Sequence, residues 1–163
     1  MATMQIEARN DFAADAVSTY TMLTDPTFLA AVCIASGDLR HKVDAGPQHS
    51  TVERVMSSPP AVRSLLGDTL TLVQDLRWNP SGADGSRTAA LTLSVKGMPA
   101  KADLVVTLRP GGRGTVVDFK GEFRIRVPLL GAKLESQAAP ALLAGFSTQQ
   151  DVGDAWLAQA AAS

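Results

Sequence analysis

His41 is a candidate for proton transfer, because a histidine changes its charge close to neutral pH. It stands two residues after Leu39 and two before Val43, and side chains two apart on a strand point to the same face of a sheet. This spacing predicts that His41 points into the interior with these apolar side chains. An imidazole there orients a ligand or acts as an acid or base. The alternative is a partly buried histidine that is hydrogen-bonded to a neighbouring protein group.

Two other polar residues share a predicted strand face with apolar residues. Gln74 alternates with Leu72 and Leu76, and a buried amide that finds no partner in protein, water or ligand costs about 1–3 kcal/mol. A further strand is predicted over residues 50–57, but its pattern allows two registers, and Arg54 points inward in only one of them. An inward guanidinium suits a ligand carboxylate, whereas in the other register Arg54 is solvated.

Other patterns that resemble functional sites lack the partners that such sites need. Cys33 has no evident basic neighbour to lower the pKa of its thiol, so we interpret it as a small buried apolar residue. His41 and His49 lack the nearby cysteines or carboxylates of a metal site. The glycine-rich segment 111–114 lacks the Gly-Lys-Ser/Thr ending of a phosphate-binding loop. We therefore expect no metal, no cofactor and no set of catalytic residues.

The composition is typical of a folded domain, with 163 residues of which 45% are hydrophobic and 19% charged. We expect residues 1–163 to form a single domain. No stretch of about 18 apolar residues is present, which argues against a membrane span. Residues 1–15 lack the apolar segment of a signal peptide, so we expect a cytoplasmic protein.

The charge distribution is uneven, although the 15 basic and 16 acidic residues give a net charge of −1. Residues 77–133 hold 10 basic and 4 acidic residues, a pattern that would attract nucleic acid if it formed one patch. Lys120, Arg124 and Arg126 instead alternate with apolar residues, as on a solvated sheet face. Only 5% of residues are aromatic, so stacking surfaces for bases are scarce, and we expect no nucleic-acid partner.

Apolar and polar residues alternate in segments that predict seven strands. The connections between most of them are short turns rich in glycine and proline, and short turns join antiparallel strands. The predicted strands cover residues 4–8, 39–43, 50–57, 70–78, 89–95, 102–108 and 115–127.

Helices are predicted at three places in the chain, one of them a short helical turn over residues 61–66. Asp15 is expected to cap a helix over residues 16–23, and Asp25 followed by Pro26 is expected to begin a second helix that ends at residue 35. A long amphipathic helix is predicted over residues 129–160, with a bend at Pro140. This helix is the only large amphipathic element that can cover the apolar face of the sheet. A twisted sheet curls, so we expect an interior gap between it and the helix, in an α+β fold.

This order of elements resembles the START-like, or SRPBCC, helix-grip superfamily, which includes polyketide cyclases, lipid-transfer domains and coenzyme-Q-binding proteins. The resemblance is carried by residues 14–28, with the phrase TDPTFL at residues 24–29, and by the strand and helix of residues 114–156. It looks closest to an uncharacterised branch of stand-alone bacterial domains. It implies a seven-stranded curved sheet wrapped around the C-terminal helix, and a small molecule bound between them.

The sequence therefore favours non-catalytic binding or transport of a hydrophobic or amphipathic, lipid-like or polyketide-like molecule by a monomer or homodimer. A mostly apolar cavity with a few polar groups is typical of such sites. One alternative is a cyclase or aromatase that uses His41 as acid–base, and another is a protein-interaction module whose core is filled. The residues predicted to line the pocket are His41, Arg54, Leu72, Gln74, Leu91, Leu93, Leu104, Val106, Val117, Phe119, Phe123, Leu142 and Phe146.

Overall fold

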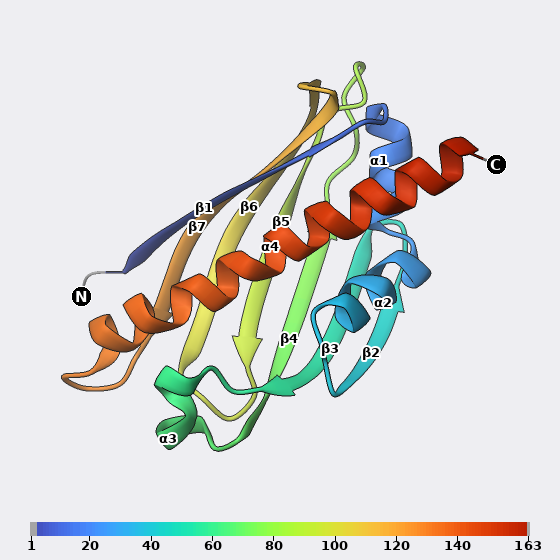
Figure 1. Ribbon diagram of the computed structural model, residues 1–163. Coiled ribbons are helices and arrows are strands. Elements are labelled where there is room, and N and C mark those ends of the chain that lie inside the picture. Colours follow the sequence, from blue (N-terminus) through green and yellow to red (C-terminus); the bar gives the residue numbers. More distant parts are fainter. Residues whose placement is uncertain (1–2, 163) are drawn as a thin grey trace.

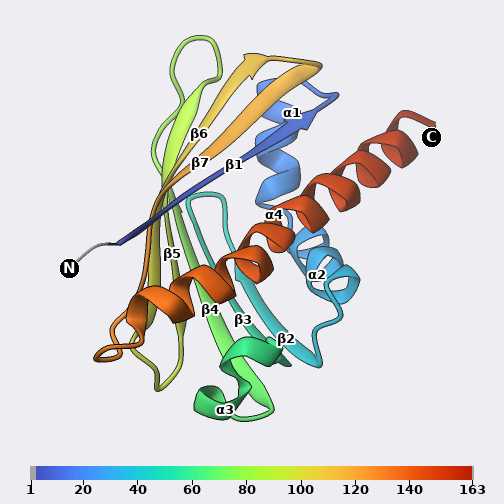
Figure 2. The ribbon, with the colours of Figure 1, turned by 60° about the vertical axis from the view of Figure 1, so that its left-hand side comes forward.

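A seven-stranded antiparallel sheet curls around one long helix in the computed structural model, which describes residues 3–162 (Figures 1 and 2). The strands follow the order β1-β7-β6-β5-β4-β3-β2, so the first strand lies beside the last, and β1 and β2 form the two edges. The strands are β1 (Met4–Phe12), β2 (Arg40–Ala45), β3 (His49–Ser57), β4 (Thr69–Trp78), β5 (Arg87–Val95), β6 (Ala100–Gly111) and β7 (Gly114–Ile125). The predicted α+β class, the seven strands and their antiparallel pairing are confirmed.

The first two helices begin where the sequence predicts, and the long C-terminal helix begins two residues later than expected. Helix α1 (Ala16–Leu23) is capped by Asp15, whose carboxylate accepts a hydrogen bond from the backbone N–H of Ser18. Helix α2 (Pro26–Ala35) is capped in the same way by Asp25. A short 3₁₀ turn η1 (Pro60–Val62) and helix α3 (Arg63–Leu66) lie between β3 and β4, and helix α4 (Gly131–Ala162) ends the chain. Helix α4 runs unbroken through Pro140.

The two possible registers of β3 are distinguished by burial. Val52 and Arg54 are buried and Met56 is partly buried, so these residues point toward α4. In the pairing of β3 with β4, Arg54 lies opposite Leu72 and Val52 lies opposite Gln74. Residues directly opposite one another share a face of the sheet. Arg54 and Gln74 therefore face the interior.

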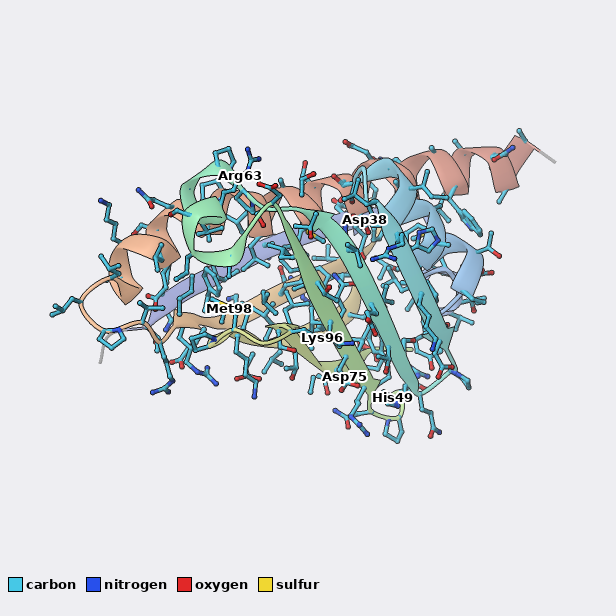
Figure 3. The ribbon with its side chains drawn as sticks, turned by 90° about the horizontal axis from the view of Figure 1, so that it is seen from below. Asp38, His49, Arg63, Asp75, Lys96 and Met98 are labelled. Atoms are coloured by element: carbon cyan, nitrogen blue, oxygen red, sulfur yellow. The ribbon has the colours of Figure 1, made fainter. Side chains whose placement is uncertain are left out.

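Charged residues cover the face of the sheet that points away from α4. Lys120 lies 3.4 Å from Glu7, and Arg124 lies 2.9 Å from Asp103. Figure 3 shows Lys96 on this same side. The basic residues of the central strands are thus paired with acids on a solvated face, as their alternation predicts, and do not form an uncompensated patch.

Gly121 allows the backbones of β6 and β7 to approach each other closely in the middle of β7. A Cβ atom at this position would lie 1.9 Å from the carbonyl oxygen of Asp103 and 2.7 Å from the Cα of Leu104, both on β6. Distances below 3.0 Å are too short for a real Cβ, so any larger residue would force β6 and β7 apart. The pairing of β7 with both neighbours continues through Gly121.

The C-terminal half of α4 is fixed to β1 by close packing and by hydrogen bonds. A Cβ at Gly153 would lie 2.3 Å from the ring of Phe12, so only glycine allows the helix to approach this buried ring. The side-chain amide of Asn10 donates to the Phe146 carbonyl at 3.1 Å and accepts from Gln149 at 2.9 Å. The start of α4 is also held to the sheet, because the buried carboxylate of Glu135 accepts a hydrogen bond from the backbone N–H of Ile125 at 2.8 Å.

We predict that Gly153→Ala lowers the free energy of unfolding by about 1–3 kcal/mol, because the added methyl overpacks the contact with Phe12. Gly145→Ala is the matched control in the same helix, since a Cβ there meets nothing within 4 Å. That control should stabilise the protein by about 0.5–1 kcal/mol through helix propensity. Denaturant titration measures both changes, and equal effects of the two substitutions would show that the Phe12 contact does not limit the position of α4.

Candidate functional site

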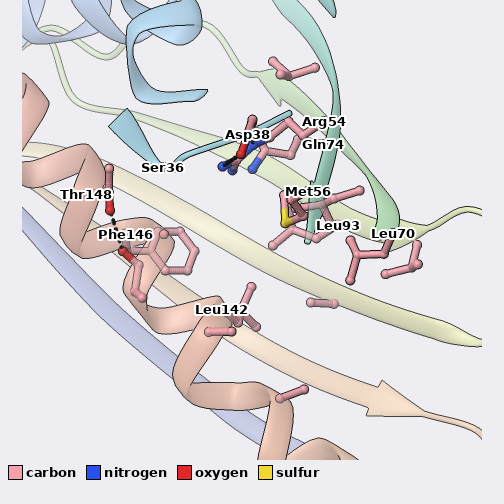
Figure 4. A pocket seen from close by; sticks show the side chains of 18 of the residues that line it. Ser36, Asp38, Arg54, Met56, Leu70, Gln74, Leu93, Leu142, Phe146 and Thr148 are labelled. Atoms are coloured by element: carbon pink, nitrogen blue, oxygen red, sulfur yellow. Dashed lines mark hydrogen bonds and ion pairs between the residues drawn. The ribbon is translucent and has the colours of Figure 1, made fainter. Parts of the chain in front are cut away.

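A cavity of about 680 Å³ lies between α4 and the concave face of the sheet (Figure 4). Its wall is mostly apolar and comes from strands β3 to β7, from the end of α1, from α2, from the segment before β4 and from α4. The large apolar side chains on this wall include Leu23, Val32, Met56, Leu70, Leu72, Leu91, Leu93, Val106, Phe119, Phe123, Leu142 and Phe146.

The cavity is open at one end and closed at the other. Apart from Lys101, the exposed wall residues belong to three segments, 36–37 after α2, 57–63 before and within α3, and 141–144 of α4. We infer that the cavity opens between these segments. At the opposite end the wall residues Leu23 and Trp78 are buried, and the ring of Trp78 meets the ring of Tyr20 from α1 edge-on at 5.3 Å.

A buried ion pair forms part of the wall. The guanidinium of Arg54 donates to both carboxylate oxygens of Asp38, from Nε at 2.6 Å and from a terminal nitrogen at 2.9 Å (Figure 4). The two side chains are only 7% and 1% exposed. Gln74 lies beside this pair in Figure 4. Arg54 is thus neutralised by the protein itself. The carboxylate that its guanidinium binds is that of Asp38, where the sequence suggested a ligand carboxylate.

Cys33 lies in the same part of the wall but is not a reactive thiol. Burial is the main cause that raises the pKa of its thiol to about 11; Asp38 adds to this rise and Arg54 opposes it. A thiolate is the nucleophilic form of cysteine, and at this pKa it is scarce at neutral pH. Cys33 is 1% exposed and acts as a small apolar residue of α2, as the sequence predicts.

The structure brings most of the predicted pocket residues together on the wall of the cavity. Gln74 and Arg54 supply polar groups, and the others are apolar. The predicted residues that line the cavity are Arg54, Leu72, Gln74, Leu91, Leu93, Val106, Phe119, Phe123, Leu142 and Phe146. Whether any of them contacts a ligand stays a prediction.

Three predicted pocket residues do not line the cavity. His41 lies opposite Arg54 and shares its face, but it belongs to the edge strand β2 and its side chain is exposed. Leu104 and Val117 are buried in the closed core instead. Val117 pairs with Asn10, beside the region where α4 is fixed to β1. Alternation gives the face of the sheet, but it does not give the distance from the sheet edge or from the helix.

Two polar residues of the cavity wall, Asp38 and Ser50, were not predicted from the sequence. Asp38 follows the α2 helix in a loop, where nothing in the local pattern marks it as the partner of a strand residue sixteen positions away. The signal that could have found Asp38 is the inward register of Arg54, because a buried guanidinium needs a carboxylate nearby.

Within residues 3–162, no three histidine, cysteine or carboxylate side chains come together as metal ligands do.

The sequence matches the family described as protein of unknown function (DUF2505) over residues 7–157. The chain belongs to the DUF2505 family. Comparison with curated proteins gives no significant match. None of the helices in the described part of this DUF2505 protein combines the length and apolar character needed to cross a membrane.

Solved structures show that this DUF2505 protein has the START-like fold predicted from the order of its elements. The di-domain ARO/CYC protein StfQ of the steffimycin biosynthetic pathway aligns with a TM-score of 0.68 at 13% identity, over 99% of this chain and 52% of that chain. The protein TTHA0849 from Thermus thermophilus aligns with a TM-score of 0.62 at 12% identity, over 99% of this chain and all of that one (100%). Human STARD10 aligns with a TM-score of 0.60 at 11% identity, over 91% and 62% of the two chains.

We predict that Asp38→Asn destabilises the protein by about 3–5 kcal/mol, because it leaves the buried Arg54 guanidinium without its counter-charge. The double variant Asp38→Leu with Arg54→Met should recover most of this loss, since apolar residues can replace a buried ion pair. Glu53→Gln is a control that neutralises a carboxylate in the more exposed pair with Lys96, and it should change stability little. If Asp38→Asn alone were as stable as the wild type, the ion pair between Asp38 and Arg54 would not contribute to stability.

We predict that Cys33 in the folded protein reacts very slowly with 5,5′-dithiobis(2-nitrobenzoate) at pH 8. With a pKa of about 11, only about one thiol in a thousand is ionised at that pH, and the sulfur is also buried. One thiol per chain should react promptly after unfolding in guanidinium chloride. Prompt reaction of the native protein would mean that the α2 wall of the cavity opens readily.

Proposed function

We propose that this DUF2505 protein binds a hydrophobic or amphipathic small molecule in the cavity between the sheet and α4, without catalysing a reaction. The observation that carries this proposal is a cavity of about 680 Å³ with a largely apolar wall. Ligand cavities commonly have about 300–1,000 Å³ and apolar walls with few polar groups. The proposed ligand is lipid-like or polyketide-like, with its apolar body against the leucine and phenylalanine side chains.

The exposed residues at one end of the cavity also support a ligand that enters and leaves. The wall is interrupted by exposed residues in three separate segments, and one of them, 57–63, contains the short turn η1 and leads into α3. Small residues, Ala141 and Ala144, form the α4 side of this opening.

The polar groups of the wall favour binding over acid–base chemistry. Gln74 has no titratable proton, and the Arg54 guanidinium is held by Asp38. The thiol of Cys33 has a raised pKa. His41, the acid–base candidate of the cyclase hypothesis, is exposed on the edge strand. StfQ is an ARO/CYC protein by name, yet the likeness at 13% identity carries the fold and not its reaction.

We predict that the neutral apolar fluorophore N-phenyl-1-naphthylamine binds one site per chain with increased emission. Leu142→Trp should weaken this binding at least about tenfold, because Leu142 lines the cavity and a larger ring fills it. Leu143→Trp is the matched control, since Leu143 is the next residue of α4 and is not part of the wall.

Fluorescence titration measures both affinities, and native mass spectrometry of the purified protein checks for a co-purified ligand. Absence of fluorophore binding by the wild type would count against the proposed function. Equal weakening by Leu142→Trp and Leu143→Trp would place the fluorophore outside the cavity, and the cavity would then have no demonstrated ligand.

A further inference from the structure

The closed end of the cavity holds two buried polar atoms that have no hydrogen-bond partner, Nε1 of Trp78 and Oγ of Ser50. Trp78 is 6% exposed and Ser50 is 2% exposed, and both residues line the cavity. The great majority of buried polar groups in proteins are hydrogen-bonded, so each exception calls for a partner that is not part of the protein. Among residues 3–162 the one further atom of this kind, Oγ of Ser58, belongs to the opposite end of the same wall.

The two atoms belong to neighbouring positions on the inner face of the sheet. Ser50 of β3 lies opposite Leu76 of β4, and the backbone N–H of Trp78 donates to the Gln48 carbonyl at 2.8 Å. Ser50 and Trp78 are therefore diagonal neighbours on one face, with Cβ atoms about 7–8 Å apart or less. One end of a single bound molecule can reach both side chains.

The surroundings keep this polar pair in place. The ring of Tyr20 meets the Trp78 indole edge-on, with an angle of 85° between the planes. The guanidinium of Arg87 lies over the Tyr20 ring at 3.7 Å from its centre, and Arg87 is not part of the cavity wall. The indole is thus held by an aromatic contact rather than by a hydrogen bond, and its N–H is left for another partner.

The chemistry of the two groups defines that partner. An indole N–H only donates, so the partner must accept a hydrogen bond, whereas the Ser50 hydroxyl both donates and accepts. The one arginine on the inner face nearby, Arg54, is neutralised by Asp38. A carboxylate buried at this end would therefore lack a counter-charge, which is unfavourable.

We propose that Ser50 and Trp78 form a subsite for an uncharged oxygen, a ketone carbonyl or a hydroxyl, at the inner end of an otherwise apolar ligand. This inference rests on the proposed function and adds the class and the orientation of the ligand: the oxygen lies at the closed end under α1, and the apolar body points toward the opening. An unsubstituted hydrocarbon and an anionic head group are both poorer matches.

The test compares two rigid molecules of the same size, 9-fluorenone and fluorene, which differ by a carbonyl oxygen. Each displaces N-phenyl-1-naphthylamine from the protein, and we expect fluorenone to bind about tenfold more tightly. In ¹H–¹⁵N spectra, fluorenone should move the indole N–H signal of Trp78 downfield while fluorene does not. The chain has two tryptophans, and the variants Trp78→Phe and Trp156→Phe assign their signals.

Variants separate the hydrogen bond from general packing. Trp78→Phe and Ser50→Ala should each reduce the preference for fluorenone over fluorene, because each removes one hydrogen-bonding group of the subsite. Ser50→Ala deletes only an unpaired hydroxyl, so it should not lower the melting temperature. Trp156→Phe is the matched control, since Trp156 packs on Phe28 and is not part of the cavity wall. It should leave the preference for fluorenone intact.

The outcomes distinguish the subsite from the proposed function. Equal affinities for fluorenone and fluorene, or a Trp78 signal that does not respond to fluorenone, would overturn the subsite while binding of the fluorophore still supports the cavity. That result would assign the two polar atoms to ordered water. Failure of the fluorophore and of both probes to bind would overturn the proposed function and the subsite together. The wild-type comparison does not depend on the folding of any variant.

Discussion

The contact between α4 and β1 is the constraint on which the cavity depends. Phe12 is completely buried against Gly153, at a distance that no side chain on the helix would allow. The buried amide of Asn10 is satisfied by the carbonyl of Phe146 and by Gln149, so a shift of the helix would leave a buried polar group unpaired. One half of α4 is therefore fixed to the sheet edge. Between this anchor and the hydrogen bond from Ile125 to Glu135 near its start, α4 crosses the curved sheet, and wall residues of this stretch, between positions 138 and 149, face the cavity.

The buried charges on the wall of that space, Arg54 and Asp38, neutralise each other, and its other charged residues, Arg63 and Lys101, are exposed. Arg54 and Asp38 come from β3 and from the loop after α2, and their bidentate contact leaves neither charge free for a ligand. The same pair acts in opposite directions on the thiol of Cys33, whose pKa is governed by burial. Where the protein leaves polar atoms unpaired, at Ser50 and Trp78, they are uncharged. A neutral, mostly apolar ligand fits both facts.

Local sequence patterns predicted correctly which face of the sheet each residue occupies, but only in part which residues line the cavity. His41 and Arg54 lie opposite one another on β2 and β3 and share a face of the sheet, as alternation requires. His41 is nevertheless exposed, whereas Arg54 is buried, with 6% of its surface exposed. The difference is that β2 is an edge strand. Leu104 likewise has the predicted orientation, but it is buried in the core and does not line the cavity. The pairing partners of a strand decide these cases, and they are distant in the sequence.

The sequence alone determined the α+β class, the seven strands, the capped starts of α1 and α2, and the long C-terminal helix. These features follow from interactions within a few residues: the period of two on a strand, the Asp15 and Asp25 caps, and the period of a helix. Only the tertiary structure decided that β1 lies beside β7, that Asp38 neutralises Arg54, and that Ser50 and Trp78 meet at a closed end. Each of these depends on segments brought together by the curvature of the sheet and by the anchoring of α4, which no local pattern encodes.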